Sequence, residues 1–175
     1  FPAGGGGDVN GDGYDDLAFA EMDVDRHTFV EVLYGRAGDD DGLLETDEAF
    51  DGSGRGFAVG GSVDVSSENG LVRVVGDLNG DGFDDVALGS PGHGNPDVGG
   101  VFVVFGAATP PVGLTLDDLR AGRGGYTVEG TVSGTQLGWA LDGGDLDGDG
   151  LDDLVIGAPS TNGPAGQPSA GQVIV

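Results

Sequence analysis

The chain has 175 residues with no cysteine, and its formal net charge at pH 7 is −25. The length suits one domain or part of one, and the absence of thiols excludes disulfides, zinc–thiolate sites and cysteine catalysis. Such an acidic surface repels nucleic acid and anionic membranes, and no run of about 18 apolar residues offers a membrane span.

The first predicted unit, residues 1–54, begins with the apolar segment Phe1–Ala3 and an acidic loop over Asp8–Asp16. Two apolar runs follow, Leu17–Ala20 and Phe29–Tyr34, and each has the length and residue types of a strand. The chain shows neither an initiating Met nor a signal peptide, so we expect a processed or excised piece of a longer protein.

The second predicted unit, residues 55–130, repeats this order, with Phe57 ahead of an acidic loop over Asp77–Asp85. An apparent insertion, Val63–Leu71, separates the two. Later in the unit, Thr115–Arg120 predicts one helical turn with Thr115 as its N-cap. The strands predicted here are Val86–Gly89, Gly100–Phe105 and Gly125–Glu129.

The third predicted unit, residues 131–175, carries Trp139 ahead of an acidic loop over Asp145–Asp153. Because Trp139 and Phe57 precede their loops in the same way, we expect both rings to pack in the core rather than to stack on a sugar. The strands predicted here are Leu154–Gly157 and Gly171–Val175.

The three acidic loops begin at residues 8, 77 and 145, so they lie 69 and 68 residues apart. A fixed period of this kind indicates a repeat architecture. Short antiparallel strands, four to a unit and with almost no helix signal, predict an all-β fold of three β-propeller blades; a β-solenoid usually has a shorter repeat. The strands after the loops are apolar on both faces, as expected for inner strands packed between neighbouring sheets.

Each acidic loop has the pattern Asp-x-Asn/Asp-x-Asp-Gly-x-Asp-Asp. Calcium takes roughly six to eight oxygen ligands, and side chains at loop positions one, three and five reach one centre where the backbone coils tightly. Glycine at position six permits that coil, position seven offers its carbonyl, and position nine closes the site with a carboxylate. We therefore predict three calcium sites. Their ligands are Asp8, Asn10, Asp12, Tyr14 and Asp16; Asp77, Asn79, Asp81, Phe83 and Asp85; and Asp145, Asp147, Asp149, Leu151 and Asp153.

The three loops are not expected to be equal. The third has four ligand carboxylates where the others have three and an amide, so it should bind most tightly. The first loop lies so close to the start of the chain that it is the one we expect to be imperfect. The aspartates at position eight should point away from the ion, into solvent or a loop hydrogen bond; they are Asp15, Asp84 and Asp152.

Solvated turns, EF-hands and magnesium sites fit the acidic pattern less well than calcium loops. Two carboxylates about 5 Å apart repel by on the order of 3 kcal/mol at an effective dielectric of about 20, so solvated Asp-Gly turns explain three such loops poorly. EF-hands need a glutamate at position twelve and flanking helices, whereas position twelve here is Phe19, Leu88 or Ile156. Magnesium avoids sites made only of protein ligands.

These motifs resemble the FG-GAP repeats of integrin alpha-subunit-type β-propellers, including bacterial members. The resemblance is closest in Leu137–Leu141, Gly144–Pro159 and Ala170–Val175. It extends to Gly76–Asp85, Gly99–Gly106 and the inter-repeat segment Leu114–Gly130. It implies a calcium-stabilised extracellular interaction scaffold with roughly seven blades. Three units cannot close such a ring, so we expect the chain to be part of a larger or multi-chain assembly.

A catalytic constellation is hard to find in the sequence. His27 and His93 lie in polar connections, and Asp39–Asp41 is a charge run typical of a solvated loop tip. No G-x-S-x-G elbow, P-loop or H-E-x-x-H motif occurs, although the many carboxylates leave a glycosidase pair open. We expect no enzymatic activity in this chain.

Three functions remain open at this point. The first is a secreted or cell-surface scaffold, made rigid by calcium, that binds a protein or a glycan, for example in cell adhesion. The second is a subunit of a self-assembling extracellular fibre or coat, in which the strand at Gln172–Val175 pairs with another copy. The third is a non-catalytic accessory domain of a secreted enzyme. None of the three functions involves binding to nucleic acid or insertion into a membrane.

Overall fold

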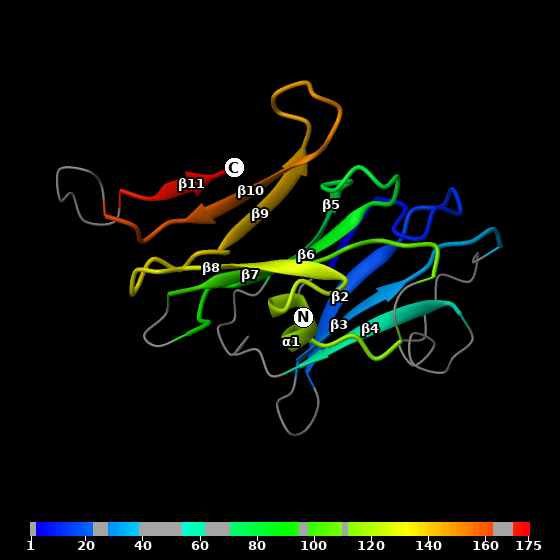
Figure 1. Ribbon diagram of the computed structural model, residues 1–175, viewed down its shortest axis with the longest axis horizontal. Coiled ribbons are helices and arrows are strands. Elements are labelled where there is room, and N and C mark those ends of the chain that lie inside the picture. Colours follow the sequence, from blue (N-terminus) through cyan, green and yellow to red (C-terminus); the bar gives the residue numbers. More distant parts are fainter. Residues whose placement is uncertain are drawn as a thin grey trace.

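The computed structural model describes residues 3–22, 28–38, 54–61, 71–94, 98–109, 112–162 and 170–175. Within these ranges the strands form three antiparallel sheets that follow one another along the chain (Figure 1). The prediction of an all-β fold made of successive sheets is confirmed.

The strands of each sheet are neighbours in sequence as well as in space. The first sheet has the order β1 (Ala3–Gly5), β2 (Leu17–Met22), β3 (Thr28–Leu33) and β4 (Gly56–Gly61). The second has the order β5 (Leu71–Gly76), β6 (Asp85–Ser90), β7 (Gly100–Val104) and β8 (Gly125–Glu129). The third consists of β9 (Ala140–Gly144), β10 (Asp153–Ala158) and β11 (Gln172–Ile174), with β10 in the middle.

Each acidic loop is the connection between the first two strands of its sheet. In the third sheet Gly144 pairs with Asp153 across the base of the loop. In the second, Gly76 pairs with Asp85 after a register shift that follows Val74. The two ends of a loop are therefore held side by side by the strand ladder, which forces the intervening residues into a compact coil.

The second sheet lies between the other two, and its middle strands are buried on both faces. Every residue of β6 and β7 is buried. In β6, Val86 and Leu88 belong to the core shared with the first sheet, and Ala87 belongs to the core shared with the third. Because successive side chains of a strand point to opposite faces, one strand contributes to both cores. The expectation that the strands after the loops pack between sheets is confirmed for this unit.

The predicted helical turn is present as α1 (Leu116–Arg120). Thr115 caps it, because its hydroxyl accepts the backbone N–H of Asp118 while the Asp118 carboxylate accepts the N–H of Thr115. Leu116 and Leu119 are buried in the core between the first two sheets. No helix in the described ranges is long and apolar enough to cross a membrane.

The sheets and the predicted sequence units differ at one boundary. Residue 55 was expected to begin the second unit, but β4 pairs with β3 and completes the first sheet. Gly56-Phe57 therefore corresponds to Gly125-Tyr126 at the start of β8, which is the last strand of the second sheet.

The expected position of Trp139 is wrong for the same reason. Phe57 is on an outermost strand and is buried, whereas Trp139 precedes β9, the first strand of its sheet, and its side chain is 39% exposed. The two aromatic residues looked equivalent because each stands ahead of an acidic loop, yet an additional strand, β5, separates Phe57 from the second loop.

Several sequence predictions fall on residues outside the described ranges. These are His27, Asp39–Asp41 and the greater part of the apparent insertion before Leu71. His93 is described: its ring packs edge-on against Phe102, with 5.5 Å between the ring centroids.

Candidate functional site

The backbone of each acidic loop coils around the carboxylate at position one. In the second loop, Asp77 Oδ1 accepts the N–H of Gly80 at 2.7 Å and of Asp81 at 3.1 Å, and Oδ2 accepts the N–H of Gly82 at 2.8 Å. Gly80 and Gly82 have φ angles of 78° and 89°, a region that favours glycine. The same three bonds are made by Asp8 and by Asp145.

Positions three and five are drawn into the same coil. Asn79 Oδ1 accepts the N–H of Asp81 at 2.8 Å, and Asp81 Oδ1 accepts the N–H of Phe83 at 3.0 Å. The Asn79 amide also donates to Asp81 Oδ2 at 3.0 Å. The first loop repeats these three bonds with Asn10, Asp12 and Tyr14.

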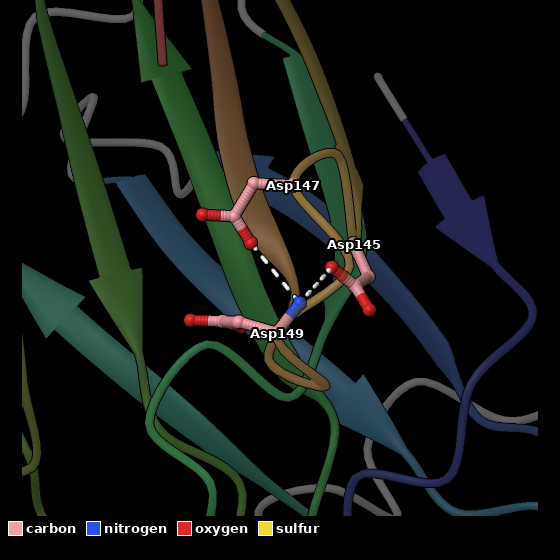
Figure 2. Close-up of side chains that lie close together, drawn as sticks. All are labelled: Asp145, Asp147 and Asp149. Atoms are coloured by element: carbon pink, nitrogen blue, oxygen red, sulfur yellow. Dashed lines mark hydrogen bonds between the residues drawn. The ribbon is translucent and has the colours of Figure 1, made fainter.

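The third loop has an aspartate in place of the amide. The backbone N–H of Asp149 donates to the carboxylates of both Asp145 and Asp147 (Figure 2). Carboxylate oxygens of Asp145, Asp147 and Asp149 lie within 4.8 Å of one another, and all three residues are exposed. Three acidic side chains therefore converge on a small volume that is open to solvent.

The carboxylate at position nine connects each loop to the rest of its sheet. Asp85 is 0% exposed, and its Oδ2 accepts the N–H of Leu78 while its Oδ1 accepts the N–H of Gly106, just beyond β7. Asp16 makes the equivalent bonds to Val9 and Gly35. In the third loop, Asp153 Oδ2 accepts the N–H of Leu146 at 2.9 Å.

Burial gives two of these closing carboxylates an unusual affinity for protons. Burial is the largest cause that raises the pKa of Asp85 to about 7 and that of Asp16 to about 6. The backbone N–H donors lower each value in part, and the loop aspartates at positions five and one raise it again. None of the ion pairs seen among the described residues involves a loop aspartate; those pairs join Arg120 and Arg123 to Asp117, Asp118 and Glu129.

The donor set of each loop fits a hard cation. Carboxylate and amide oxygens at positions one, three and five lie in one coil, and a further carboxylate lies at its base. No ion pair within the described part of the chain joins a basic side chain to them. Oxygen ligands of this type and number suit calcium. The backbone coil brings positions one, three and five together in each loop. Among the described residues, only the carboxylates of Asp145, Asp147 and Asp149 lie within 4.8 Å of one another, and the position-nine carboxylates are not part of such a cluster. The side-chain ligands and the carbonyl ligands Tyr14, Phe83 and Leu151 all remain predictions.

The position-eight aspartates have a role that the sequence did not indicate. They were expected to point into solvent or a loop hydrogen bond. Two of them make a loop hydrogen bond, but its partner is the loop of another sheet: Asp84 Oδ2 accepts the N–H of Asp8 at 2.7 Å, and Asp152 Oδ2 accepts the N–H of Asp77 at 2.9 Å. Each bond joins two loops from different sheets. The only signal available was that all three loops carry aspartate at this position.

Comparison with known proteins identifies the repeat. The FG-GAP repeat family matches residues 74–104 and 137–175, which include the second and third acidic loops. Phosphatidylinositol-glycan-specific phospholipase D of Rattus norvegicus is 38% identical over 96 residues, which cover 52% of this chain and 11% of that protein. The Homo sapiens protein of the same name is 29% identical over 167 residues, covering 89% of this chain and 18% of that protein.

An integrin subunit matches the chain as well. Integrin alpha-PS2 of Drosophila melanogaster is 34% identical over 92 residues, covering 52% of this chain and 6% of that protein. The chain thus spans less than a fifth of the length of these relatives. From the acidic repeat, the successive antiparallel sheets and these matches, residues 74–104 and 137–175 are FG-GAP repeats, which are β-propeller blades.

Proposed function

We propose that the chain is a calcium-stabilised, non-catalytic part of an extracellular or cell-surface β-propeller that binds a protein or glycan, as in cell adhesion. The observation that carries this proposal is the same coil of oxygen donors in all three loops, each at the connection between the first two strands of its sheet. A repeated site at equivalent positions of successive blades suits a structural ion better than a reacting one.

In this proposal calcium stabilises the blades by linkage. The oxygens that would hold the ion come together only when the loop is folded, so calcium binds the folded state and raises the free energy of unfolding by RT ln(1 + [Ca]/Kd). That is about 2.7 kcal/mol for each site at a hundredfold excess over Kd. Because Asp16 and Asp85 also bond to backbone beyond the third strand of their sheets, ordering a loop would hold most of a blade.

The proposed ligands follow the loop positions. Side chains at positions one, three, five and nine and the carbonyl at position seven would form each site. The third loop, with four carboxylates, is proposed to bind most tightly.

A second candidate is a non-catalytic accessory domain of a secreted enzyme. It is favoured by the phospholipase D relatives, since 89% of this chain matches a region that makes up 18% of the human protein. The stabilising role of the loops would be the same, and the two candidates differ in what adjoins the blades. A third candidate, self-association, is supported by β11, which pairs with β10 alone among the described strands and leaves Val173 66% exposed.

Thermal unfolding with and without calcium tests the proposal. The chain is melted in excess calcium and in EGTA, and calorimetric titration counts the bound ions. A calcium-dependent rise of the midpoint with three bound ions supports three structural sites. An unchanged midpoint, or no heat of binding at millimolar calcium, would overturn the proposal.

A further inference from the structure

The acidic loops of neighbouring sheets are joined by a reciprocal pair of hydrogen bonds. Asp84 Oδ2 accepts the N–H of Asp8 at 2.7 Å, and the N–H of Asp84 donates to the carbonyl of Asp8 at 3.1 Å. One step further along the chain, Asp152 Oδ2 accepts the N–H of Asp77 at 2.9 Å, and the N–H of Asp152 donates to the carbonyl of Asp77 at 3.1 Å. We call this pair of bonds the loop clamp.

Apolar packing accompanies each clamp. A Cβ atom placed on Gly11, at position four of the first loop, would lie 2.6 Å from the ring of Phe83. A Cβ atom placed on Gly80, the equivalent residue of the second loop, would lie 2.8 Å from Leu151 Cδ2. The position-seven side chain of one loop thus covers the position-four glycine of the loop before it, and two neighbouring loops touch through both polar and apolar contacts.

The glycine before each clamped aspartate permits the close approach. A Cβ atom on Gly76 would lie 2.0 Å from Asp152 Oδ2, and one on Gly7 would lie 2.7 Å from Asp84 Oδ2. At the third loop, a Cβ atom on Gly144 would have nothing within 4 Å. The crowding is present only where a following loop in the described ranges supplies a position-eight aspartate.

The clamp connects the proposed ligands of two loops. Asp84 lies between Phe83 and Asp85, which are proposed ligands of the second loop, and it holds the backbone of Asp8, the first ligand of the first loop. Ordering of the second loop fixes the backbone of residues 83–85 and therefore the acceptor that holds Asp8. Asp152 stands in the same relation to Asp77.

Charge adds to this connection. The Asp84 carboxylate lies against a loop that already contains the carboxylates of Asp8 and Asp12. A cation in the first loop would offset this repulsion and would strengthen a hydrogen bond whose acceptor is charged. The clamp should therefore be tighter when the first loop is occupied, and by linkage the effect acts in both directions.

We propose that Asp84 and Asp152 are positioning residues that couple calcium binding between neighbouring loops, so that the three loops bind as a connected series. The proposal rests on the proposed calcium function. Asp15 has the same position in the first loop, is exposed, and makes no hydrogen bond to another loop within the described residues. It provides a matched control, because its removal has the same local effect on its own loop without breaking a clamp.

The test is a calcium titration followed by NMR, which resolves the loops through the amides of Gly13, Gly82 and Gly150. Asp84→Ala is expected to weaken calcium binding in the first loop by about fivefold or more, the lower end of typical coupling between sites. Asp15→Ala should leave the second and third loops unchanged. Asp84→Asn keeps an acceptor oxygen and is expected to restore part of the lost affinity, which also guards against a failure of Asp84→Ala to fold.

Hydrogen exchange of the Asp8 amide in EGTA measures the clamp without calcium. The amide should be protected in the parent chain and exchange faster in Asp84→Ala. The coupling is overturned if Asp84→Ala lowers the calcium affinity of the first loop no more than that of the second loop, to which Asp84 belongs. It is also overturned if the three loops of the parent chain bind calcium independently. Either result leaves the proposed calcium sites intact. Absence of any calcium-dependent shift in the parent chain would overturn the proposed function, and the coupling with it.

Discussion

Asp85 and Gly106 lie 21 residues apart in sequence, and the carboxylate Oδ1 of Asp85 accepts the backbone N–H of Gly106 at 2.9 Å. This bond ties the base of the second acidic loop to the far end of β7. Together with the bond from Leu78 it pairs two backbone donors with a fully buried carboxylate. The loop and the sheet are thereby one structural unit.

Replacement of Asp85 by alanine is expected to destabilise the protein even in EGTA. It leaves the N–H groups of Leu78 and Gly106 without their acceptor, at a cost of about 2 kcal/mol. Asp153→Ala removes a less buried carboxylate with one such donor, so it should cost about half as much. Urea unfolding of both variants measures the difference. Equal effects would mean that the bond to Gly106 contributes little.

Replacement of Asp149 by asparagine should remove the tightest calcium site. The amide oxygen can still accept the N–H of Leu151, so the loop keeps its coil while it loses one of its four ligand carboxylates. We expect affinity at that site to fall by about tenfold or more. Calorimetric titration follows the change, with Asp142→Asn, an exposed aspartate of β9 outside the loop, as the control. Retention of the tightest site in Asp149→Asn would contradict the predicted order of the loops.

Replacement of Gly89 by alanine should disturb the packing of the second sheet on the third. A Cβ atom there would lie 2.1 Å from the backbone oxygen of Gly138, which cannot move away without shifting the start of β9. We expect a loss of about 2–3 kcal/mol in the free energy of unfolding.

Gly157 occupies the equivalent place in β10 and supplies the control. A Cβ atom on Gly157 would lie 3.1 Å from the Ala140 side chain and would meet no backbone atom closer than 3.6 Å. Gly157→Ala should therefore cost less than half as much as Gly89→Ala in the same unfolding measurement. A similar cost for the two would show that the close approach of Gly89 to Gly138 is not limiting.

Metal-free stability should fall as the pH rises from about 4.5 to about 7, and Glu31 should account for part of the fall. Glu31 on β3 is 1% exposed; burial is the largest cause that raises its pKa to about 7, and Glu21 adds to the shift. The folded state then holds a proton that the unfolded state has released, so the group opposes folding increasingly as the pH rises through this window.

Glu31→Gln removes the titrating group and should make the stability curve flatter. The gain at pH 8 over the parent chain is at most about 3 kcal/mol, with little difference at pH 4. Chemical denaturation in metal-free buffer across this range compares the two chains, with Glu129→Gln as an exposed control. A constant difference between parent and Glu31→Gln at all pH values would rule out the shifted carboxyl.

Much of the fold could be predicted because it depends on short sequence patterns rather than on contacts between distant residues. The acidic loops recur at a constant period, and the apolar runs beside them, such as Leu154–Gly157, have the length of strands. The cap of α1 was equally readable, since Thr115 and Asp118 act on each other across one turn. The coil of each loop follows from its own aspartates and glycines, so it could be predicted without knowledge of the remaining chain.

What depended on distant contacts could not be predicted in the same way. Phe57 and Trp139 look alike in sequence, and only strand pairing distinguishes an outermost strand from the approach to an innermost one. The clamp joins Asp8 to Asp84 across 76 residues, and nothing local to either residue specifies its partner. The repeat reveals which positions are equivalent, but the contacts between repeats depend on how the sheets stack.

The loop clamp also has a direction. In each clamp the later unit presents its position-eight carboxylate to the unit before it, and the earlier unit presents its position-one backbone N–H to the unit after it. The second unit does both, through Asp84 and Asp77. A unit of this kind has two different contacts: a position-eight carboxylate that accepts a hydrogen bond from the preceding unit, and a position-one N–H that donates one to the following unit. Whole units could therefore be duplicated, deleted or exchanged while the hydrogen bonds between neighbouring loops are kept. A substitution at position eight alone would instead remove a hydrogen bond to the backbone of the preceding unit.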